Sequence, residues 1–146
     1  MHIYLGSDHA GFKLKEQIKQ HLNDKQINVV DCGCYEEVSC DYPDIAQKTC
    51  LEFLKDEDEN SKVFLFCGTG VGMSIAANKI KGIRAVCAND FFSVKHSRLH
   101  NDANVLCMGA RVIGIGLCLE LIDCFLTHEF QGQRHEKRVK KLEKIL

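Results

Sequence analysis

The chain has 146 residues, of which 45% are hydrophobic and 27% are charged, and its formal net charge is -1 at pH 7. A chain of this length buries roughly two thirds of its unfolded surface, so one domain over residues 1–146 needs no disulfide or metal to fold. Acidic and basic residues are interleaved, which argues against nucleic acid or a membrane surface as the main partner. Any anionic ligand must therefore be bound by a local group of residues.

The chain contains nine cysteines. An odd number, without an Asn-x-Ser/Thr sequon, argues against a secreted disulfide framework, and we expect mostly reduced thiols. There is no Cys-x-x-Cys pair, and Cys32, Cys34 and Cys40 are an incomplete zinc set, so no metal is expected. The sequence also lacks a run of about 18 apolar residues and a signal-peptide pattern, which predicts a cytoplasmic protein.

Strand and helix patterns alternate from the start of the chain. Residues 3–7 and 27–30 are short apolar runs typical of strands. Between them a helix is predicted from about Ala10, because large aliphatic residues recur every four positions on one face. These residues are Leu14, Ile18 and Leu22.

A second helix is predicted to begin at Tyr42-Pro43-Asp44, because proline suits the first helical turn. Its inward side carries Ile45, Thr49 and Phe53. The charged run at residues 56–62 that follows is most simply a solvated loop before the next strand.

The most informative segment is Val63 to Asn78, VFLFCGTGVGMSIAAN. Its first four residues are β-branched, aromatic or aliphatic and have strand length, and Gly68 and Gly70 bound this strand. Cys67 therefore lies at the carboxyl end of a strand, where α/β proteins bind ligands and the next helix points its free N–H groups. The same field favours a thiolate, so Cys67 is a candidate base or nucleophile. Burial as a small hydrophobic residue is the alternative.

The pattern continues with strands at residues 83–87 and 103–108, joined by a helix from Asp90 or Ser93 to His100. Strands that alternate with helices at this spacing form a mostly parallel sheet covered on both faces, because parallel strands need helical crossovers. We therefore predict a three-layer α/β/α, Rossmann-like domain with five parallel strands.

The last third of the chain predicts an interface. Residues 113–126 are apolar on nearly every side, and such a helix either lies centrally in a large core or packs on another chain. In so small a domain we favour a homodimer that uses the C-terminal helices, with a tetramer left open. The tail then carries Arg134 and Arg138 on an amphipathic helix, and arginine is well shaped for phosphate.

Three known glycine loops do not fit this sequence. A Walker A loop needs Gly-Lys-Ser/Thr after four residues, which neither glycine-containing turn supplies. A dinucleotide-binding loop needs Gly-x-Gly-x-x-Gly in the first βα turn, whereas residues 68–72 have another spacing and lie in the third. A cysteine phosphatase loop would place arginine six residues after Cys67, where Met73 stands.

Two further segments carry groups suited to proton transfer. Asp8 and His9 follow the first strand and belong at the same carboxyl edge as Cys67, although an N-capping aspartate beside an exposed histidine is an equal alternative. His100 titrates in the range useful for proton transfer. His96 lies one helical turn before it, but no third ligand has suitable spacing, so we favour a surface His96 and a functional His100.

Several motifs together resemble those of the ribose-5-phosphate isomerase B family, which also includes allose-6-phosphate and galactose-6-phosphate isomerases. The resemblance covers essentially the whole length. Its motifs are GSDHAGFKLK at residues 6–15, DYPD at 41–44, CGTGVGMSIAANK at 67–79, GIRA at 82–85, SRLHNDANVLCMGAR at 97–111 and GQRHEKRV at 132–139.

The resemblance implies a metal-independent aldose–ketose isomerase with no organic cofactor. Cys67 would be the base that moves a proton between C1 and C2 through an enediolate, with Thr69 polarising the thiol. One branch of the family has a cysteine at the position of Cys67. Another branch lacks this cysteine and has a glutamate at the position of Met73, so this chain resembles the first branch. His100, assisted by Asp8, would open the sugar ring.

The resemblance also implies the substrate-binding residues. Backbone N–H groups of the glycine turn would hold the enediolate oxygen, and side chains would bind the hydroxyls and the phosphate, some across a dimer interface. The turn residues are Gly68, Gly70, Val71, Gly72 and Ser74; the hydroxyl contacts are Tyr42 and Asn101; the phosphate contacts are His9, Arg111, Arg134 and Arg138.

The expected substrate is ribose 5-phosphate, within pentose phosphate interconversion. A hexose 6-phosphate is the runner-up. A non-catalytic sugar-phosphate-binding module is the alternative from another class, although the presence of Cys67, Thr69 and His100 argues against it. Redox sensing through the many cysteines is a third hypothesis.

Overall fold

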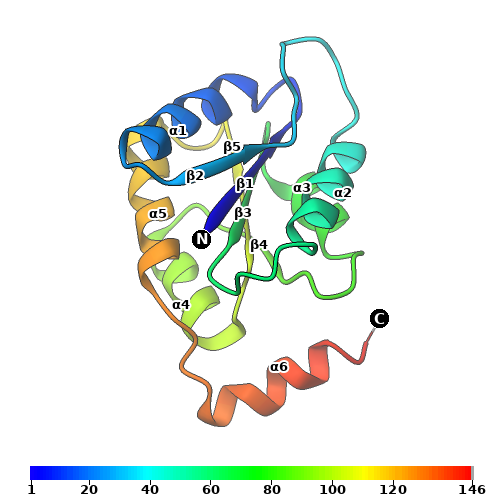
Figure 1. The fold of residues 1–146 in the computed structure, drawn as a ribbon, viewed down its shortest axis with the longest axis vertical. Coiled ribbons are helices and arrows are strands. Elements are labelled where there is room, and N and C mark those ends of the chain that lie inside the picture. Colours follow the sequence, from blue (N-terminus) through cyan, green and yellow to red (C-terminus); the bar gives the residue numbers. More distant parts are fainter. Residues whose placement is uncertain (146) are drawn as a thin grey trace.

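The computed structural model describes residues 1–145 and consists of a parallel five-stranded sheet between two layers of helices (Figure 1). The strands are β1 (His2–Ser7), β2 (Asn28–Asp31), β3 (Lys62–Cys67), β4 (Ala85–Cys87) and β5 (Val105–Gly109). The helices are α1 (Phe12–Asp24), α2 (Tyr42–Phe53), α3 (Val71–Ala77), α4 (Phe91–Asn101), α5 (Ile115–Thr127), the 3-10 turn η1 (Gln133–His135) and α6 (Glu136–Leu142). The three-layer fold with five parallel strands is confirmed.

The strand order is β2-β1-β3-β5-β4. The chain builds outward from β1 to β2 and then returns to place β3 on the other side of β1, so the direction of winding reverses between β1 and β3. Open α/β sheets bind ligands at the carboxyl ends of the strands next to such a reversal. The fold therefore assigns the functional edge to the loops after β1, β3 and β5.

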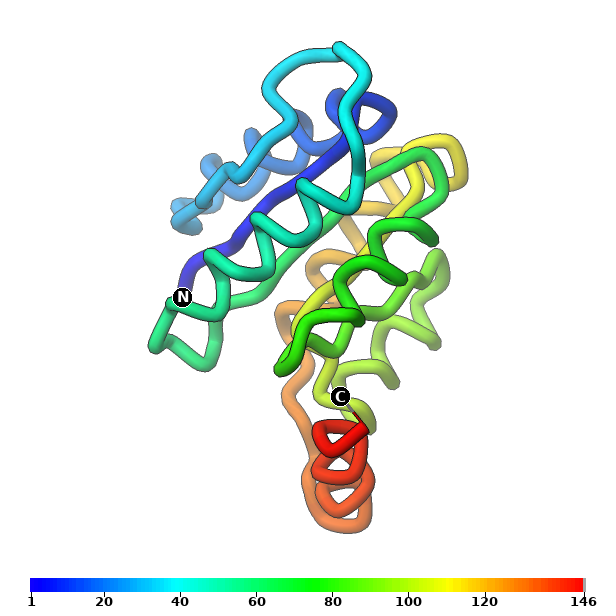
Figure 2. The backbone as a smooth tube through the Cα atoms, turned by 90° about the vertical axis from the view of Figure 1, so that its right-hand side faces the viewer, coloured from blue at the N-terminus to red at the C-terminus, as the bar shows by residue number. Residues whose placement is uncertain are grey.

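The two faces of the sheet are covered by different helices. Phe64 and Phe66 of β3 point into a core shared with α1, α4 and α5, while Val63, Leu65 and Cys67 point into a second core with α2 and α3. This alternation is the two-residue repeat of a strand that is buried on both faces. Figure 2 shows α2 and α3 running side by side along one face of the sheet, with α6 lying apart from both layers.

Several predicted boundaries move by one or two residues for local reasons. The helix α1 begins at Phe12, because Asp8 Oδ1 accepts a hydrogen bond from the Gly11 N–H at 3.0 Å and closes a turn first. The strands β4 and β5 begin later than predicted. Just before them, the Arg84 N–H donates to the side-chain oxygen Asn104 Oδ1 at 2.8 Å, so the two segments are joined there through a side chain, and the backbone ladder starts at the next residues.

The apolar helix α5 is mostly accounted for by the core of its own chain. Leu121, Ile122 and Phe125 are fully buried, and the Phe125 ring meets Phe64 edge to face at 5.8 Å. Its exposed apolar side chains, Ile115 and Leu117, lie near its start. The helix is central in this small domain because the three helices on this face share one core, so its composition alone does not require a dimer.

All nine cysteines are free thiols. Among residues 1–145, no helix has both the length and the apolar character that a membrane span requires.

Truncating α5 at its centre tests its place in the monomer core. Ile122→Ala should lower the free energy of unfolding by about 2 to 5 kcal/mol, because it leaves a cavity in a fully buried site. Ile145→Ala removes the same atoms from a side chain that is 75% exposed and should leave stability unchanged. Urea denaturation of both variants measures the difference, and equal stabilities would contradict this packing.

Candidate active site

Loops from separate parts of the chain meet at the carboxyl edge of the sheet. Asp8, directly after β1, donates its N–H to the Phe66 carbonyl of β3 at 3.1 Å. Arg111, after β5, donates its N–H to the Gly68 carbonyl at 3.0 Å, and its guanidinium lies beside that glycine, where an added Cβ would be 3.5 Å from Arg111 Nη1. The parallel strands thus bring Asp8, Cys67 and Arg111 to one edge.

The Cys67 thiol lies at the end of β3 and has a directed hydrogen-bond donor. The Gly70 N–H donates to Cys67 Sγ at 3.0 Å, and Cys67 is 5% exposed. The location predicted for Cys67 is correct, and its surroundings suit a base in a site with little water.

Thr69 forms a different contact from the one expected. Its Oγ1 accepts from the Val71 N–H at 3.3 Å, at the start of α3, and the residue is exposed. The hydroxyl therefore supports the turn that carries Gly70, and its direct action on the Cys67 thiol stays a prediction.

The glycine turn depends on backbone conformations that suit glycine. Gly70 has φ of 82°, and a Cβ added there would lie 2.9 Å from the backbone of Met108 and 3.0 Å from Cys87 Sγ. Glycine adopts positive φ without the steric cost that other residues incur. This conformation turns the Gly70 N–H back toward Cys67.

Several N–H groups of the expected oxyanion cradle are already engaged inside the turn. Gly70 donates to Cys67, Val71 donates to Thr69, and Ser74 donates to the Gly70 carbonyl at 3.1 Å. The N–H groups of residues 70, 71 and 74 therefore already have partners in the absence of an oxyanion.

Tyr42 and His9 flank this turn. The Tyr42 ring packs against Gly72, where an added Cβ would meet the ring at 2.9 Å, and 40% of Tyr42 is exposed. His9 Nδ1 accepts from the Cys40 N–H at 3.4 Å. The Asp8 carboxylate accepts from the Gly11 N–H in the turn before α1. The N-cap of α1 is Gly11, without a side-chain cap, so the alternative of Asp8 as the helix N-cap is wrong.

The second group of predicted residues lies at the opposite edge of the sheet. The helix α4 begins after the carboxyl end of β4 and runs back along the sheet, so His100 and Asn101 reach the amino edge. There Val63, near the start of β3, donates its N–H to the Asn104 carbonyl at 3.0 Å. The six residues of β3 span about 16 Å, so a single chain places His100 and Cys67 at opposite edges, although both belong to the predicted catalytic set.

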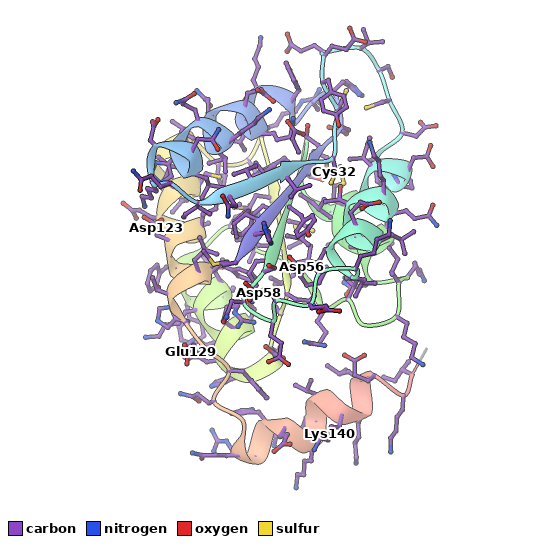
Figure 3. The ribbon with its side chains drawn as sticks, viewed as in Figure 1. Cys32, Asp56, Asp58, Asp123, Glu129 and Lys140 are labelled. Atoms are coloured by element: carbon purple, nitrogen blue, oxygen red, sulfur yellow. The ribbon has the colours of Figure 1, made fainter. Side chains whose placement is uncertain are left out.

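The C-terminal helix belongs to this second group. The His100 ring stacks on the His135 ring with centroids 4.2 Å apart, and Arg134 Nε donates to His135 Nε2 at 3.4 Å. Figure 3 shows the separation of the two edges: Cys32, just after the carboxyl end of β2, lies far from Lys140 on α6. Arg134 and Arg138 therefore accompany His100 and lie away from the Cys67 of the same chain.

The surroundings of the second group disfavour the charged form of His100. Partial burial, the neighbouring His96 and the positive charges of Arg134 and Arg138 lower the pKa of His100 from its ordinary value. The pKa of His135 is lowered by the same kinds of cause. A neutral imidazole is a proton acceptor near neutral pH, which agrees with the proton-transfer role predicted for His100.

His135 was missed in the sequence analysis. It is 7% exposed and makes the stacking contact with His100, and the available signal was its position between two arginines in a motif already noted.

Across residues 1–145, no cluster of three or more His, Cys, Asp or Glu side chains has a geometry suited to a metal ion.

Comparison with known proteins identifies the class. The family model described as Ribose/Galactose Isomerase matches residues 3–142, and the chain belongs to this family. Ribose-5-phosphate isomerase B of Escherichia coli is 42% identical over 143 residues, which are 98% of this chain and 95% of that protein. The ribose-5-P isomerase B of Listeria innocua is 41% identical over 145 residues, covering 99% and 97% of the two chains.

Solved structures show the same fold over nearly the whole chain. Ribose-5-phosphate isomerase B of Clostridium thermocellum matches with a TM-score of 0.95 at 43% identity, covering 99% of this chain and 97% of that chain. The enzyme of Mycoplasma genitalium, solved with bound ribulose-5-phosphate, matches with a TM-score of 0.92 at 39% identity, covering 99% and 95%.

Adding one methyl group to the turn should disrupt it. Gly70→Ala must fit a Cβ against the Met108 backbone at positive φ, so we expect the free energy of unfolding to fall by more than about 1 kcal/mol and turnover to be lost. Gly116→Ala, on α5 with open space around it, should retain both. Thermal unfolding and activity assays of the two variants provide the test; a fully active Gly70→Ala would contradict the account of this turn.

The effect of the neighbouring positive charges on His100 can be measured by titrating His100. Removing one positive neighbour with Arg138→Gln should raise the pKa of His100, because that charge disfavours the imidazolium. Lys137→Gln removes a charge from the same helix that does not act on His100 and should leave its titration in place. NMR of the imidazole C–H signals measures both, and a lower pKa in Arg138→Gln would contradict the assigned electrostatics.

Proposed function

We propose that this protein is an aldose–ketose isomerase that interconverts ribose 5-phosphate and ribulose 5-phosphate. Relatives named ribose-5-phosphate isomerase B align with nearly the whole chain, and one similar structure holds ribulose-5-phosphate. The observation that carries the proposal is Cys67 at the carboxyl edge, with the Gly70 N–H directed at its sulfur. A non-catalytic binding module would not need a base held in this way.

The reaction transfers one proton between neighbouring carbons and changes no overall oxidation state. The Cys67 thiolate takes the proton from C2 of the open-chain aldose, which leaves an enediolate. The hydroxyl proton passes from O2 to O1, and the Cys67 thiol returns its proton to C1 as the ketose forms. The N–H groups of the glycine turn stabilise the negative oxygen of this intermediate. His100 opens the furanose by taking the proton of the C1 hydroxyl and giving it to the ring oxygen as the C1–O bond of the ring breaks.

Each active site is completed by two chains in this proposal. Asp8, His9, Tyr42, Cys67 and Arg111 of one chain form the half at the carboxyl edge. The second half, from the partner, consists of Asn101, His100, Arg134 and Arg138. This arrangement is supported by the separation of the two halves within one chain, because neither half alone holds both the Cys67 base and the His100 proton carrier.

Exposed apolar side chains also support a homodimer. The helices α3 and α4, which follow the carboxyl ends of β3 and β4, present large apolar side chains that are half exposed or more, and exposed apolar surface is often covered at an interface. These residues are Val71, Ile75, Phe91 and Phe92. Pairing of such dimers into tetramers stays a prediction without structural support.

A hexose 6-phosphate remains the second candidate substrate, because the matching family covers both ribose and galactose isomerases.

The cytoplasmic location is proposed from the nine cysteines, whose free thiols fit a reducing compartment.

The role of Cys67 is tested by turnover. With EDTA present, the wild type should isomerise ribose 5-phosphate in preference to allose 6-phosphate, and Cys67→Ala should lose about 10²- to 10⁴-fold in kcat, since the base is gone. Cys50→Ala removes a thiol buried in the same core away from the edge and should keep kcat. Full activity of Cys67→Ala would rule out this base, and absence of wild-type turnover on both sugars would favour the binding module.

The shared site is tested by mixing two inactive chains. Cys67→Ala and His100→Ala should each be inactive, but co-expression should restore about a quarter of wild-type activity, because about half of random dimers are mixed and each has one intact site. Co-expression of Cys67→Ala with itself under a second tag is the control. No recovery in purified mixed dimers would place both residues in a site of one chain.

A further inference from the structure

A network of four charged residues joins three segments at the amino edge of the sheet. The Asp102 carboxylate accepts from Arg84 Nη2 at 2.9 Å and from Arg98 Nη1 at 3.0 Å. Arg84 also donates through Nη1 to Glu143 Oε1 at 2.6 Å, beyond the end of α6. The order Arg98–Asp102–Arg84–Glu143 therefore links α4 to α6 through the residue that precedes β4.

The network fixes the backbone just after His100 and Asn101. Asp102 ends α4 with φ of 48°, a left-handed conformation that aspartate adopts more readily than most residues. Arg84 Nε binds the Asp102 carbonyl at 2.7 Å, and Arg98, which is 6% exposed, binds the Ala103 carbonyl at 2.6 Å. Both the carboxylate and the carbonyl of Asp102 are thus held, and with them the end of the helix that carries His100.

The helix α6 has little apolar anchoring near its C-terminal end. A cavity of about 350 Å³ lies between α6, α4 and β4, with Leu142, Asn101 and Arg84 among its lining residues. Leu142 remains 45% exposed beside it. Since apolar contact is weak there, the ion pair between Glu143 and Arg84 is the specific contact that sets the position of this end, while His135 on His100 sets the other.

We propose that Arg84, Asp102 and Glu143 are positioning residues that hold His100 and the phosphate-binding arginines of η1 and α6 as one rigid unit. The proposal rests on the proposed function, because it assigns these arginines to the substrate phosphate. Glu143 sets the position of the α6 end that follows Arg138. Asp102 sets the position of His100, on which His135 stacks beside Arg134. The half-site at the amino edge is therefore assembled within its own chain before it meets the Cys67 half.

The two ends of the network predict different kinetic defects. Glu143→Gln should raise KM for ribose 5-phosphate about three- to tenfold and leave kcat within about twofold, because an ion pair at this exposure contributes little to stability but orients α6. Asp102→Asn should lower kcat more than it raises KM, because asparagine tolerates the left-handed conformation while the two arginines lose their shared anion.

The binding of inorganic phosphate distinguishes a positioning role of Glu143 from a direct effect of its charge. Glu143→Gln removes a negative charge near an anion site, so Coulomb attraction alone would tighten phosphate binding. Positioning predicts the opposite, a dissociation constant for inorganic phosphate that rises about three- to tenfold, measured by calorimetry with the intact protein. Glu143→Asp, which keeps the charge but shortens the reach, should weaken binding in the same direction.

The matched control is Glu136→Gln, which breaks an ion pair of the same length with Lys140 on the same helix without touching Arg84. It should leave KM, phosphate affinity and melting temperature at wild-type values. Tighter or unchanged phosphate binding in Glu143→Gln, or an equal effect of Glu136→Gln, overturns the proposal. If the wild type shows no turnover, the proposed function fails, and the phosphate measurements still decide the positioning role.

Discussion

The direction in which a crossover helix must run governs this molecule. In a parallel sheet, every connecting helix starts at the carboxyl edge and returns the chain to the amino edge. Cys67 ends the strand β3 and His100 lies at the end of the helix α4, so the two are at opposite edges. The need for a second chain in the proposed site follows from this topology, because no local adjustment within one chain shortens the length of the sheet.

Each edge is organised by a different kind of interaction. At the carboxyl edge the backbone provides most of the order: the turn at Gly70 directs an N–H at the Cys67 sulfur. At the amino edge charged side chains do so, with Asp102 binding both Arg84 and Arg98. The first arrangement suits a reaction that develops negative charge on an oxygen, and the second holds the helix α6, to which the proposal assigns phosphate binding.

The apolar core makes this division possible. Two separate clusters, one with α1, α4 and α5 and the other with α2 and α3, bury the sheet on both faces. The edges are then free to carry polar groups. The buried length of α5 within this core also means that an interface between chains is better supported by the exposed side chains near the carboxyl edge, such as Phe91 and Phe92, than by α5.

The sequence by itself determined the alternation of strands and helices, the place of Cys67 after β3 and the family motifs, because these depend on short-range periodicity and residue identity. It did not reveal that His100 lies away from Cys67, since spacing along the chain does not encode which edge a helix end reaches. The contacts of Arg84 with Asp102 and Glu143, and of His135 with His100, join residues that are distant in sequence or unremarkable in pattern. Only the tertiary structure decided these, because they depend on how separately formed helices pack around one sheet.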